Sequence, residues 1–153
     1  MKFMTDANLG SLTKWLRILG YDTVYWRGNA DRIFLAKAQK DNRIVLTRKR
    51  ELVKRQFSGR LLLLKTDLAK NQLQEVLTEF SLRPDPGRMF TICLKCNALL
   101  ADLEKDAALG LVPAYIFSHY SRFRICPVCG SVYWPGSHKD RARDFLLRLE
   151  QEN

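Results

Sequence analysis

Two short runs of aliphatic residues constrain the fold of this chain more than any other feature of its sequence. Ile44–Leu46 and Leu61–Leu64 contain no polar side chain, so a strand formed by either run must be buried on both faces. Antiparallel sheets often leave one face in water, whereas parallel sheets are covered by helices on both faces. The two runs therefore favour a parallel sheet that lies between helices.

Strand-like and helix-like segments alternate four times before residue 82. We expect strands at 2–5, 23–26, 44–47 and 61–65. We expect helices at 9–19, between Asp31 and the turn at 41–42, at 49–57, and around Leu73, Val76, Leu77 and Phe80. Asn8 and Asp31 are suited to cap the first two helices, and Gly20 to end the first. This alternation predicts an α/β domain with a parallel sheet.

A proline- and glycine-containing segment follows this pattern. Residues 83–88 read RPDPGR, which is typical of a linker. We therefore expect an α/β domain at 1–82, a linker at 83–88, and a small module with a C-terminal helix at 89–153. A chain of 153 residues is long enough for a domain of about 80–90 residues and one such module.

The composition indicates a globular protein away from membranes. The chain is 46% hydrophobic and 27% charged, which is outside the range of disordered chains. Its longest aliphatic run, Leu61–Leu64, is far too short to span a bilayer. The N-terminus reaches Asp6 before any long apolar stretch, which argues against a signal peptide. We expect a cytoplasmic protein that does not bind membranes.

Positive charge is concentrated in the first part of the chain. The net charge is +10, and residues 1–82 hold 16 basic and 8 acidic side chains, against 10 and 8 in residues 83–153. A basic surface attracts phosphate polyanions through counterion release, so RNA is the expected partner; solubility alone is the alternative. The densest run follows the third expected strand and supplies the candidate RNA-binding residues Arg48, Lys49, Arg50, Lys54 and Arg55.

Three acidic residues are expected at one edge of the sheet. Asp6, Asp31 and Asp67 each follow a different strand, and ligands of open parallel sheets bind beyond the carboxyl ends of the strands. Asp22 precedes its strand and belongs at the opposite edge. Three converging carboxylates can hold Mg²⁺ or Mn²⁺, which activates water for phosphodiester hydrolysis. Each acid has a simpler explanation: Asp31 can cap its helix, and Asp67 can be a turn residue.

Four cysteines form two CxxC pairs separated by 29 residues. Cys93 and Cys96 make the first pair, and Cys126 and Cys129 make the second. Two such pairs can supply four thiolates to one tetrahedral Zn²⁺, and Gly130 suits the left-handed backbone of a zinc knuckle. Disulfides or free thiols are the alternatives, and the cytoplasmic expectation disfavours disulfides. Since sulfur fills all four positions, the predicted zinc is structural.

Aromatic residues follow the second cysteine pair in the sequence VYWPGSH, residues 132–138. Tyr133, Trp134 and His138 can stack on unpaired bases, and Trp134 is the candidate RNA contact. The alternative is that the aromatic residues pack the zinc module against the sheet domain. His119 and His138 are surplus to a four-cysteine site, and we assign neither a catalytic role.

Five stretches of the sequence together resemble a known family, the Mut-seven C-terminal RNase domain, which is a PIN-like nuclease fold with a zinc ribbon. The resemblance covers almost the whole chain. The stretches are DANLGSLTKWLRILGYD (6–22), LTRKREL (46–52), QL (72–73), CLKCNALL (93–100) and CPVCGSVYWPGSH (126–138).

The resemblance implies metal-dependent RNA cleavage by clustered acids, which correspond here to Asp6, Asp31 and Asp67. One position departs from the family, which reads Thr-Arg-Asp at the end of the third strand where this chain has Thr47-Arg48-Lys49. A lysine directed into the site would repel a divalent cation by roughly 4 kcal/mol per unit charge at about 4 Å. It can instead neutralise the acids, hold an RNA phosphate, or point outward.

Three functions are therefore compatible with the sequence. The main hypothesis is a metal-dependent ribonuclease with a structural zinc ribbon. The first alternative is a catalytically impaired RNA-binding protein on the same scaffold, because Lys49 replaces the usual acid. The second alternative is a protein-interaction module that uses the zinc ribbon.

Overall fold

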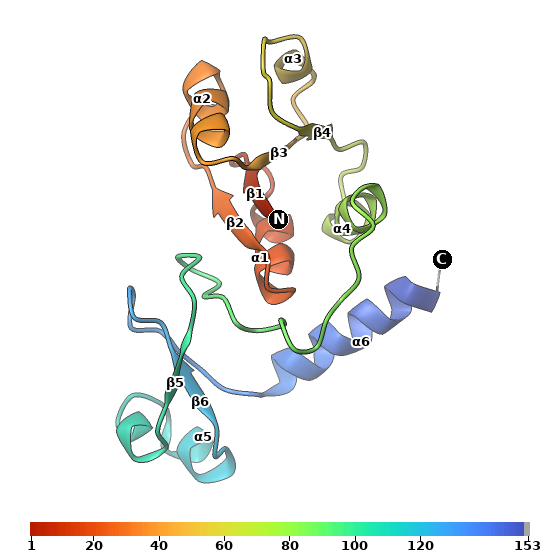
Figure 1. Ribbon diagram of the computed structural model, residues 1–153. Helices are drawn as coiled ribbons and strands as arrows, with labels where there is room; N and C mark the ends of the chain where they lie inside the picture. The colour runs from red at the N-terminus through yellow and green to blue at the C-terminus, as the bar shows by residue number, and fades with distance from the viewer. Residues whose placement is uncertain (152–153) are drawn as a thin grey trace. The chain divides into compact units, whose positions relative to one another are not determined.

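The chain forms two compact units, Met1–Met89 and Phe90–Asn153, in a computed structural model that describes residues 1–151 (Figure 1). The side chains of residues 137, 138, 141 and 149–151 lie outside this description. The expectation for the His138 side chain therefore also lies outside it. Within the described residues, no helix is long and apolar enough to cross a membrane.

The first unit has the α/β architecture that the sequence predicts. Its four strands are parallel and lie in the order β2-β1-β3-β4. They span Lys2–Thr5 (β1), Asp22–Tyr25 (β2), Ile44–Thr47 (β3) and Leu61–Leu63 (β4). The helices that alternate with them span Gly10–Ile18 (α1), Arg32–Lys40 (α2), Arg50–Val53 (α3) and Ala69–Glu79 (α4).

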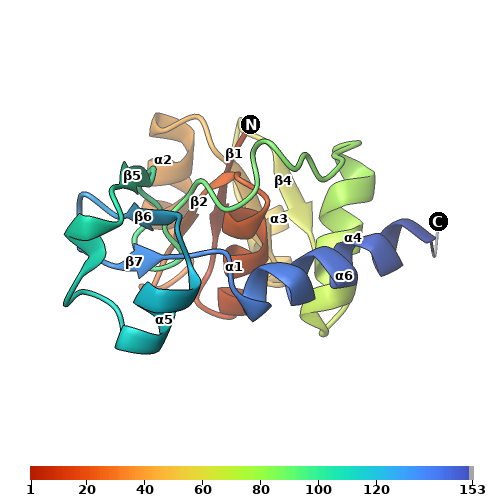
Figure 2. The ribbon, with the colours of Figure 1, turned by 90° about the horizontal axis from the view of Figure 1, so that it is seen from below.

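Helices cover both faces of this sheet. The chain moves from β1 to β2 in one direction and from β2 through β3 to β4 in the other, so right-handed crossovers place α1 on one face and α2 and α3 on the opposite face. The helix α4 packs beside α1, and Figure 2 shows both helices in front of the sheet. Both faces of the sheet are therefore covered by helices, and β3 is buried throughout, whereas the residues of the edge strand β4 are only half-buried.

Successive strand residues point to opposite faces and build two layers of core. Phe3 is fully buried on the side of α1 and α4, where its ring contacts Tyr21 and Phe80 edge-on. On the other face, Met4 and Val45 pack with residues of α2 and α3, among them Phe34, Leu35 and Leu52. These two apolar layers fix the positions of the strand ends that carry the candidate site.

Two local predictions for this unit were wrong. The N-cap of α1 is Leu9 rather than Asn8, and no side chain caps this helix. The helix α3 ends at Val53, with Lys54 as its C-cap, rather than at residue 57. Phe57 leaves the helical path and packs against the core cluster beneath α2, which ends the helix early.

The segment expected to be a linker packs on the first unit. The guanidinium of Arg88 lies 4.9 Å from the centroid of the Tyr21 ring. A β-carbon placed on Gly20 would lie within 2.2 Å of the Arg88 carbonyl oxygen. The stretch 83–88 is therefore held by contacts with the end of α1, and the first unit extends to Met89.

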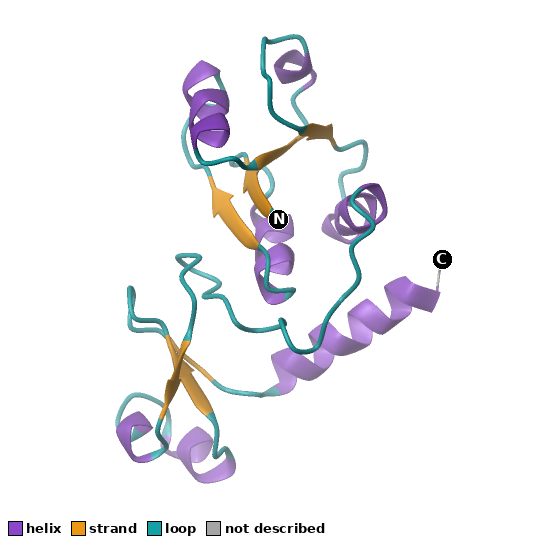
Figure 3. Ribbon diagram, in the orientation of Figure 1, coloured by secondary structure: helices purple, strands orange, loops and turns teal. Residues whose placement is uncertain are grey.

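The second unit contains a small antiparallel sheet in the order β5-β6-β7 (Figure 3). Its core is small, with Ala108, Val112 and Phe123 buried at its centre. Its elements span Ala101–Leu103 (β5), Asp106–Ala108 (η1, a 3₁₀ turn), Ala114–His119 (α5), Phe123–Ile125 (β6), Val132–Tyr133 (β7) and Ser137–Gln151 (α6). A core of this size needs an additional source of stability, such as a bound metal.

We predict that Gly20→Ala destabilises the first unit by about 2 kcal/mol or more. Gly20 has a φ of +82°, which disfavours any β-carbon, and the Arg88 carbonyl fills the space that the new methyl group needs. Urea unfolding measures the change. Gly10→Ala is the matched control, because its β-carbon meets the Tyr25 hydroxyl oxygen at an ordinary 3.5 Å, and an equal effect of both changes would contradict the prediction.

Candidate functional site

The reversal of strand order places a site at the carboxyl ends of β1 and β3. From β1 the chain continues to β2 on one side, and from β3 it continues to β4 on the other side. Open α/β sheets bind ligands where the strand order reverses in this way. Thr5 lies opposite Leu46 in their register, so Asp6 and Thr47 are the next residues on the two strands. Both of these polar side chains are buried, with exposed fractions of 1% for Asp6 and 0% for Thr47.

The Asp6 carboxylate connects these two strand ends. The Thr47 hydroxyl donates to Asp6 Oδ2 at 2.6 Å, and the Asn8 backbone N–H donates to Asp6 Oδ1 at 2.9 Å. The Lys49 backbone N–H in turn donates to Thr47 Oγ1 at 3.0 Å, which completes a short chain of hydrogen bonds. A carboxylate can accept about four hydrogen bonds, so Asp6 keeps acceptor capacity for a ligand.

Asp31 and Asp67 have different partners. Asp31 is the N-cap of α2, where its Oδ1 accepts from the backbone N–H groups of Ile33 at 2.9 Å and Phe34 at 3.4 Å. The Asp67 side chain is 76% exposed and forms an ion pair with Arg48. Both residues follow the strands after which the sequence places them. Asp31 has the simpler role of a helix cap, and Asp67 takes part in a surface ion pair.

The three acids do not form a ready-made site for Mg²⁺ or Mn²⁺. Among the described residues, the ligand atoms of three or more metal-binding side chains converge at the four cysteines. Asp6, Asp31 and Asp67 are not a convergent group of this kind, and their binding of Mg²⁺ or Mn²⁺ stays a prediction.

Thr47 and Glu75 belong to this edge and were missed by sequence reasoning. Glu75 on α4 accepts from the backbone N–H groups of Lys65 and Thr66, both at 3.0 Å, and from the Thr66 hydroxyl at 2.6 Å. It thereby fixes the loop that follows β4 and carries Asp67. The sequence indicates Thr47 only as a strand end, because its contact with Asp6 joins residues that are far apart in the chain.

The basic run surrounds the short helix α3. Lys49 is the N-cap of α3 and is half-buried, and its ammonium has no hydrogen-bond or ion-pair partner among the described residues. Arg50, Lys54 and Arg55 are exposed, and Arg48 is paired with Asp67. The carboxyl edge near β3 therefore carries more cationic than anionic side chains.

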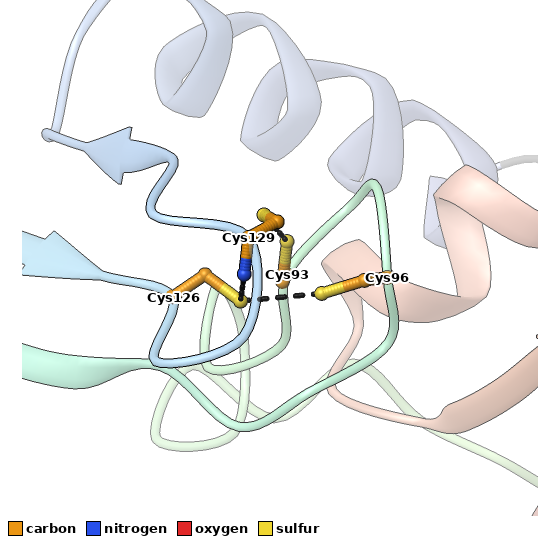
Figure 4. A group of neighbouring side chains, drawn as sticks. All are labelled: Cys93, Cys96, Cys126 and Cys129. Carbon is orange, nitrogen blue, oxygen red and sulfur yellow. Dashed lines mark hydrogen bonds between the residues drawn. The ribbon is translucent and has the colours of Figure 1, made fainter.

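The four cysteines of the second unit converge (Figure 4). Their sulfur atoms all lie within 4.8 Å of one another, with 3.2 Å between Cys96 and Cys126 and 3.6 Å between Cys93 and Cys129. A tetrahedral Zn²⁺ with bonds of about 2.3 Å separates its sulfur ligands by about 3.8 Å. The cluster therefore fits zinc, and its four thiols are the ligands that zinc prefers in structural sites.

The two cysteine pairs use the same loop geometry. The Asn97 N–H donates to the Cys93 carbonyl at 3.0 Å, and the Gly130 N–H donates to the Cys126 carbonyl at 2.9 Å. Asn97 and Gly130 follow their pairs directly and have φ values of 67° and 72°. The left-handed conformation expected at Gly130 is confirmed, and Asn97, which tolerates it, plays the same part in the first loop.

Hydrogen bonds give the thiols different pKa values in the metal-free cluster. The Ser131 side chain and backbone lower the pKa of Cys129 to about 6. For Cys96, the backbone hydrogen bond from Ala98 lowers the pKa, but the shared hydrogen bond with Cys126 and burial raise it to about 12. The raised pKa favours a protonated Cys96, and zinc binding must displace this proton.

Two aromatic residues after β6 pack within the second unit. The Tyr133 hydroxyl accepts from the Leu94 N–H at 3.1 Å and lies 3.1 Å from Cys93 Sγ, so it supports the first cysteine loop. Burial raises the pKa of Tyr133 well above its usual value, which keeps the hydroxyl protonated. Trp134 is half-buried against the core that contains Phe123, and its expected contact with RNA remains a prediction.

A family comparison agrees with this fold and this metal cluster. The family model described as the Mut7-C RNAse domain matches residues 1–146. The structure defines a class of protein in which a parallel α/β unit is followed by a unit with a four-cysteine cluster. The chain belongs to the Mut7-C RNAse domain family. No curated protein and no solved structure matches the chain.

We predict that Cys126→Ser abolishes tight zinc binding and unfolds the second unit, while the sheet of the first unit persists. The small core centred on Phe123 cannot replace the stability that four metal bonds supply. Zinc released on denaturation reports stoichiometry, and amide spectra report the two units separately. A variant that retains one equivalent of zinc with an intact second unit would refute the four-cysteine site.

Tyr133→Phe is predicted to weaken zinc binding by about 10- to 100-fold without unfolding the protein. The change removes the hydroxyl that orients Cys93 and satisfies the Leu94 N–H, and loss of such supporting groups has effects of this size. Competition with a colorimetric chelator measures the affinity. Tyr115→Phe provides the control, since Tyr115 is 65% exposed, and the two variants should differ clearly.

Proposed function

We propose that the protein is a ribonuclease that acts on RNA at the carboxyl edge of its four-stranded sheet. The family match over residues 1–146 supports this class of activity. The observation that carries the proposal is the Asp6 carboxylate, which is buried at the ends of the two central strands and has no cationic partner among the described residues. A buried carboxylate with so few partners is costly to maintain, which favours a functional role.

The cationic side chains near β3 complete the proposed RNA site. Arg50 and Lys54 are exposed and can contact phosphate oxygens, and Arg48 can do so if it leaves Asp67. Phosphate contacts position RNA without reading its sequence. In this proposal Asp6 accepts a hydrogen bond or a proton at the reacting centre, while the cations hold the strand in place.

Metal dependence is a separate part of the proposal. Mg²⁺ or Mn²⁺ held by Asp6, Asp31 and Asp67 would require Asp67 to leave Arg48 and Asp31 to turn from its helix cap. The cleavage assay therefore compares buffers with and without either added cation.

A second candidate function is RNA binding without cleavage. The Arg48–Asp67 ion pair and the unpaired Lys49 ammonium favour it, because both oppose a cluster of free carboxylates. A lysine at this position holds a phosphate as a point charge. Both candidates place RNA at the same edge, and cleavage distinguishes them.

We predict that Asp6→Asn lowers single-turnover cleavage of a mixed single-stranded RNA pool by about 100-fold or more. The amide keeps the size of the carboxylate but has one acceptor oxygen, so it cannot accept from both the Thr47 hydroxyl and the Asn8 N–H; the melting temperature should fall, while RNA binding should change little. Glu104→Gln is the control, because it removes one negative charge from the second unit. Unchanged cleavage by Asp6→Asn would contradict the assigned role.

Lys49→Asp tests the position where the chain departs from its family. The change restores a carboxylate and removes an ammonium, so it should increase cleavage that depends on added Mn²⁺ or Mg²⁺. If the wild type and Lys49→Asp both bind RNA but neither cleaves it with any added cation, the RNA-binding function replaces the ribonuclease. Equal cleavage by both proteins shows that the Lys49 amine acts outside the reacting centre.

A further inference from the structure

A groove runs along the helical face formed by α2 and the segment that follows α3. Its main cavity has a volume of about 430 Å³, within the range of about 300–1,000 Å³ for pockets that hold small ligands. Arg32 and Arg55 lie on its walls, Gln39 and Gln56 add two amides, and Phe57 supplies an aromatic ring. No acidic residue lines this cavity.

The polar groups of this cavity are free to bind a ligand. Arg32, Arg55, Gln39 and Gln56 are exposed, and their side chains have no hydrogen-bond or ion-pair partner among the described residues. Two unpaired guanidinium groups across one cavity create a strong preference for an anion with several oxygens, such as a phosphate diester.

The apolar part of the cavity is suited to a planar ring. Leu35 and Ala36 of α2 line it together with Phe57, which is half-buried against the core beneath α2. Gly59 packs closely on the Phe57 ring, because a β-carbon at this glycine would lie 2.4 Å from Phe57 Cζ. The ring is therefore held in place by a residue without a side chain, which is consistent with a preformed stacking surface.

The groove begins at the carboxyl edge of the sheet and continues away from it. Arg32 directly follows Asp31 at the start of α2, and Gln39 lies about 10 Å further along the helix at 1.5 Å per residue. A second cavity of about 180 Å³ shares Gln39 with the first and is also lined by Arg60. A strand that leaves the edge at Asp31 can therefore continue into this groove.

We propose that this groove binds an unpaired nucleotide of single-stranded RNA, with its phosphate between Arg32 and Arg55 and its base on Phe57. The two amides of Gln39 and Gln56 can then donate to and accept from the base edge. Base pairing would hide both the ring face and that edge, so a duplex is a poor ligand. The inference rests on the proposed action on RNA and adds a binding subsite outside the carboxyl edge.

The double substitution Arg32→Ala/Arg55→Ala tests the phosphate contacts. Binding of a fluorescein-labelled octauridylate to the zinc-loaded protein, without added magnesium or manganese, should weaken about tenfold or more. The slope of log affinity against log salt should become shallower by about 0.7, because the two guanidinium groups hold one phosphate and each single-strand phosphate contact contributes about 0.7. Lys14→Ala/Arg83→Ala is the control, since it removes two exposed cations from elsewhere in the same unit. Equal losses for the two double variants would overturn the proposal.

Phe57→Leu and Gly59→Ala test the base contact without changing charge. Both should weaken binding by about fivefold or more while the salt slope stays constant, because loss of base stacking is not a phosphate effect. Octamers with one 4-thiouridine should crosslink to residues 55–57 or to α2 under ultraviolet light. Melting curves confirm that the variants are folded. Wild-type affinity in both variants, or crosslinks elsewhere only, would overturn the assignment.

Two further ligands show whether the groove binds a single strand, a free nucleotide or a duplex. Uridine monophosphate should bind far more weakly than the octamer, and duplex RNA should compete poorly. Equal affinity for the mononucleotide would assign the groove to a free nucleotide and overturn its role in binding a strand. If Arg32→Ala/Arg55→Ala behaves as its control while Asp6→Asn still abolishes cleavage, the groove fails and the ribonuclease stands. If the wild type binds no RNA, both proposals fail.

Discussion

The hydrogen bond from Thr47 to the Asp6 carboxylate joins the ends of the two central strands, and the candidate site depends on it. It places a carboxylate with 1% exposure at the ends of two strands whose fully buried residues include Met4 and Val45. Burying such a group is unfavourable unless hydrogen bonds or a charge compensate, and Asp6 has only the Thr47 hydroxyl and the Asn8 N–H. The order β2-β1-β3-β4 brings these two strand ends together, so the position of Asp6 is a consequence of the sheet topology.

Charge at this edge differs from the arrangement that a cluster of free acids would give. Asp67 is paired with Arg48, Asp31 caps α2, and Lys49 is the N-cap of α3 at the end of β3. The cations continue away from the edge, because Arg32 and Arg55 line the cavity between α2 and the segment after α3. Cationic side chains are therefore distributed over a strip of the first unit, as is typical of surfaces that follow a single strand.

Much of the fold could be predicted from the sequence, because the relevant signals are local or periodic. Aliphatic runs indicated buried parallel strands, and the spacing of the cysteine pairs indicated a metal cluster, whose sulfur atoms do converge. The early end of α3 could not be predicted, since it depends on where Phe57 finds a buried position in three dimensions. The partners of Asp67 and Glu75 also escaped prediction, because ion pairs and loop contacts depend on side-chain directions that no spacing rule gives.

In the proposed binding mode, single-stranded RNA contacts the first unit at the ends of β1 and β3 and along α2. Titration of the ¹⁵N-labelled, zinc-loaded protein with an octauridylate, followed through its amide signals, tests this claim directly. The backbone N–H groups of Asn8 and Lys49 report on the site, because each belongs to the hydrogen-bond chain around Asp6 and Thr47. We predict large shifts of these two signals and of the Gln39 and Gln56 side-chain amides. Shifts confined to the second unit, with these signals unchanged, would contradict the placement of RNA on the first unit.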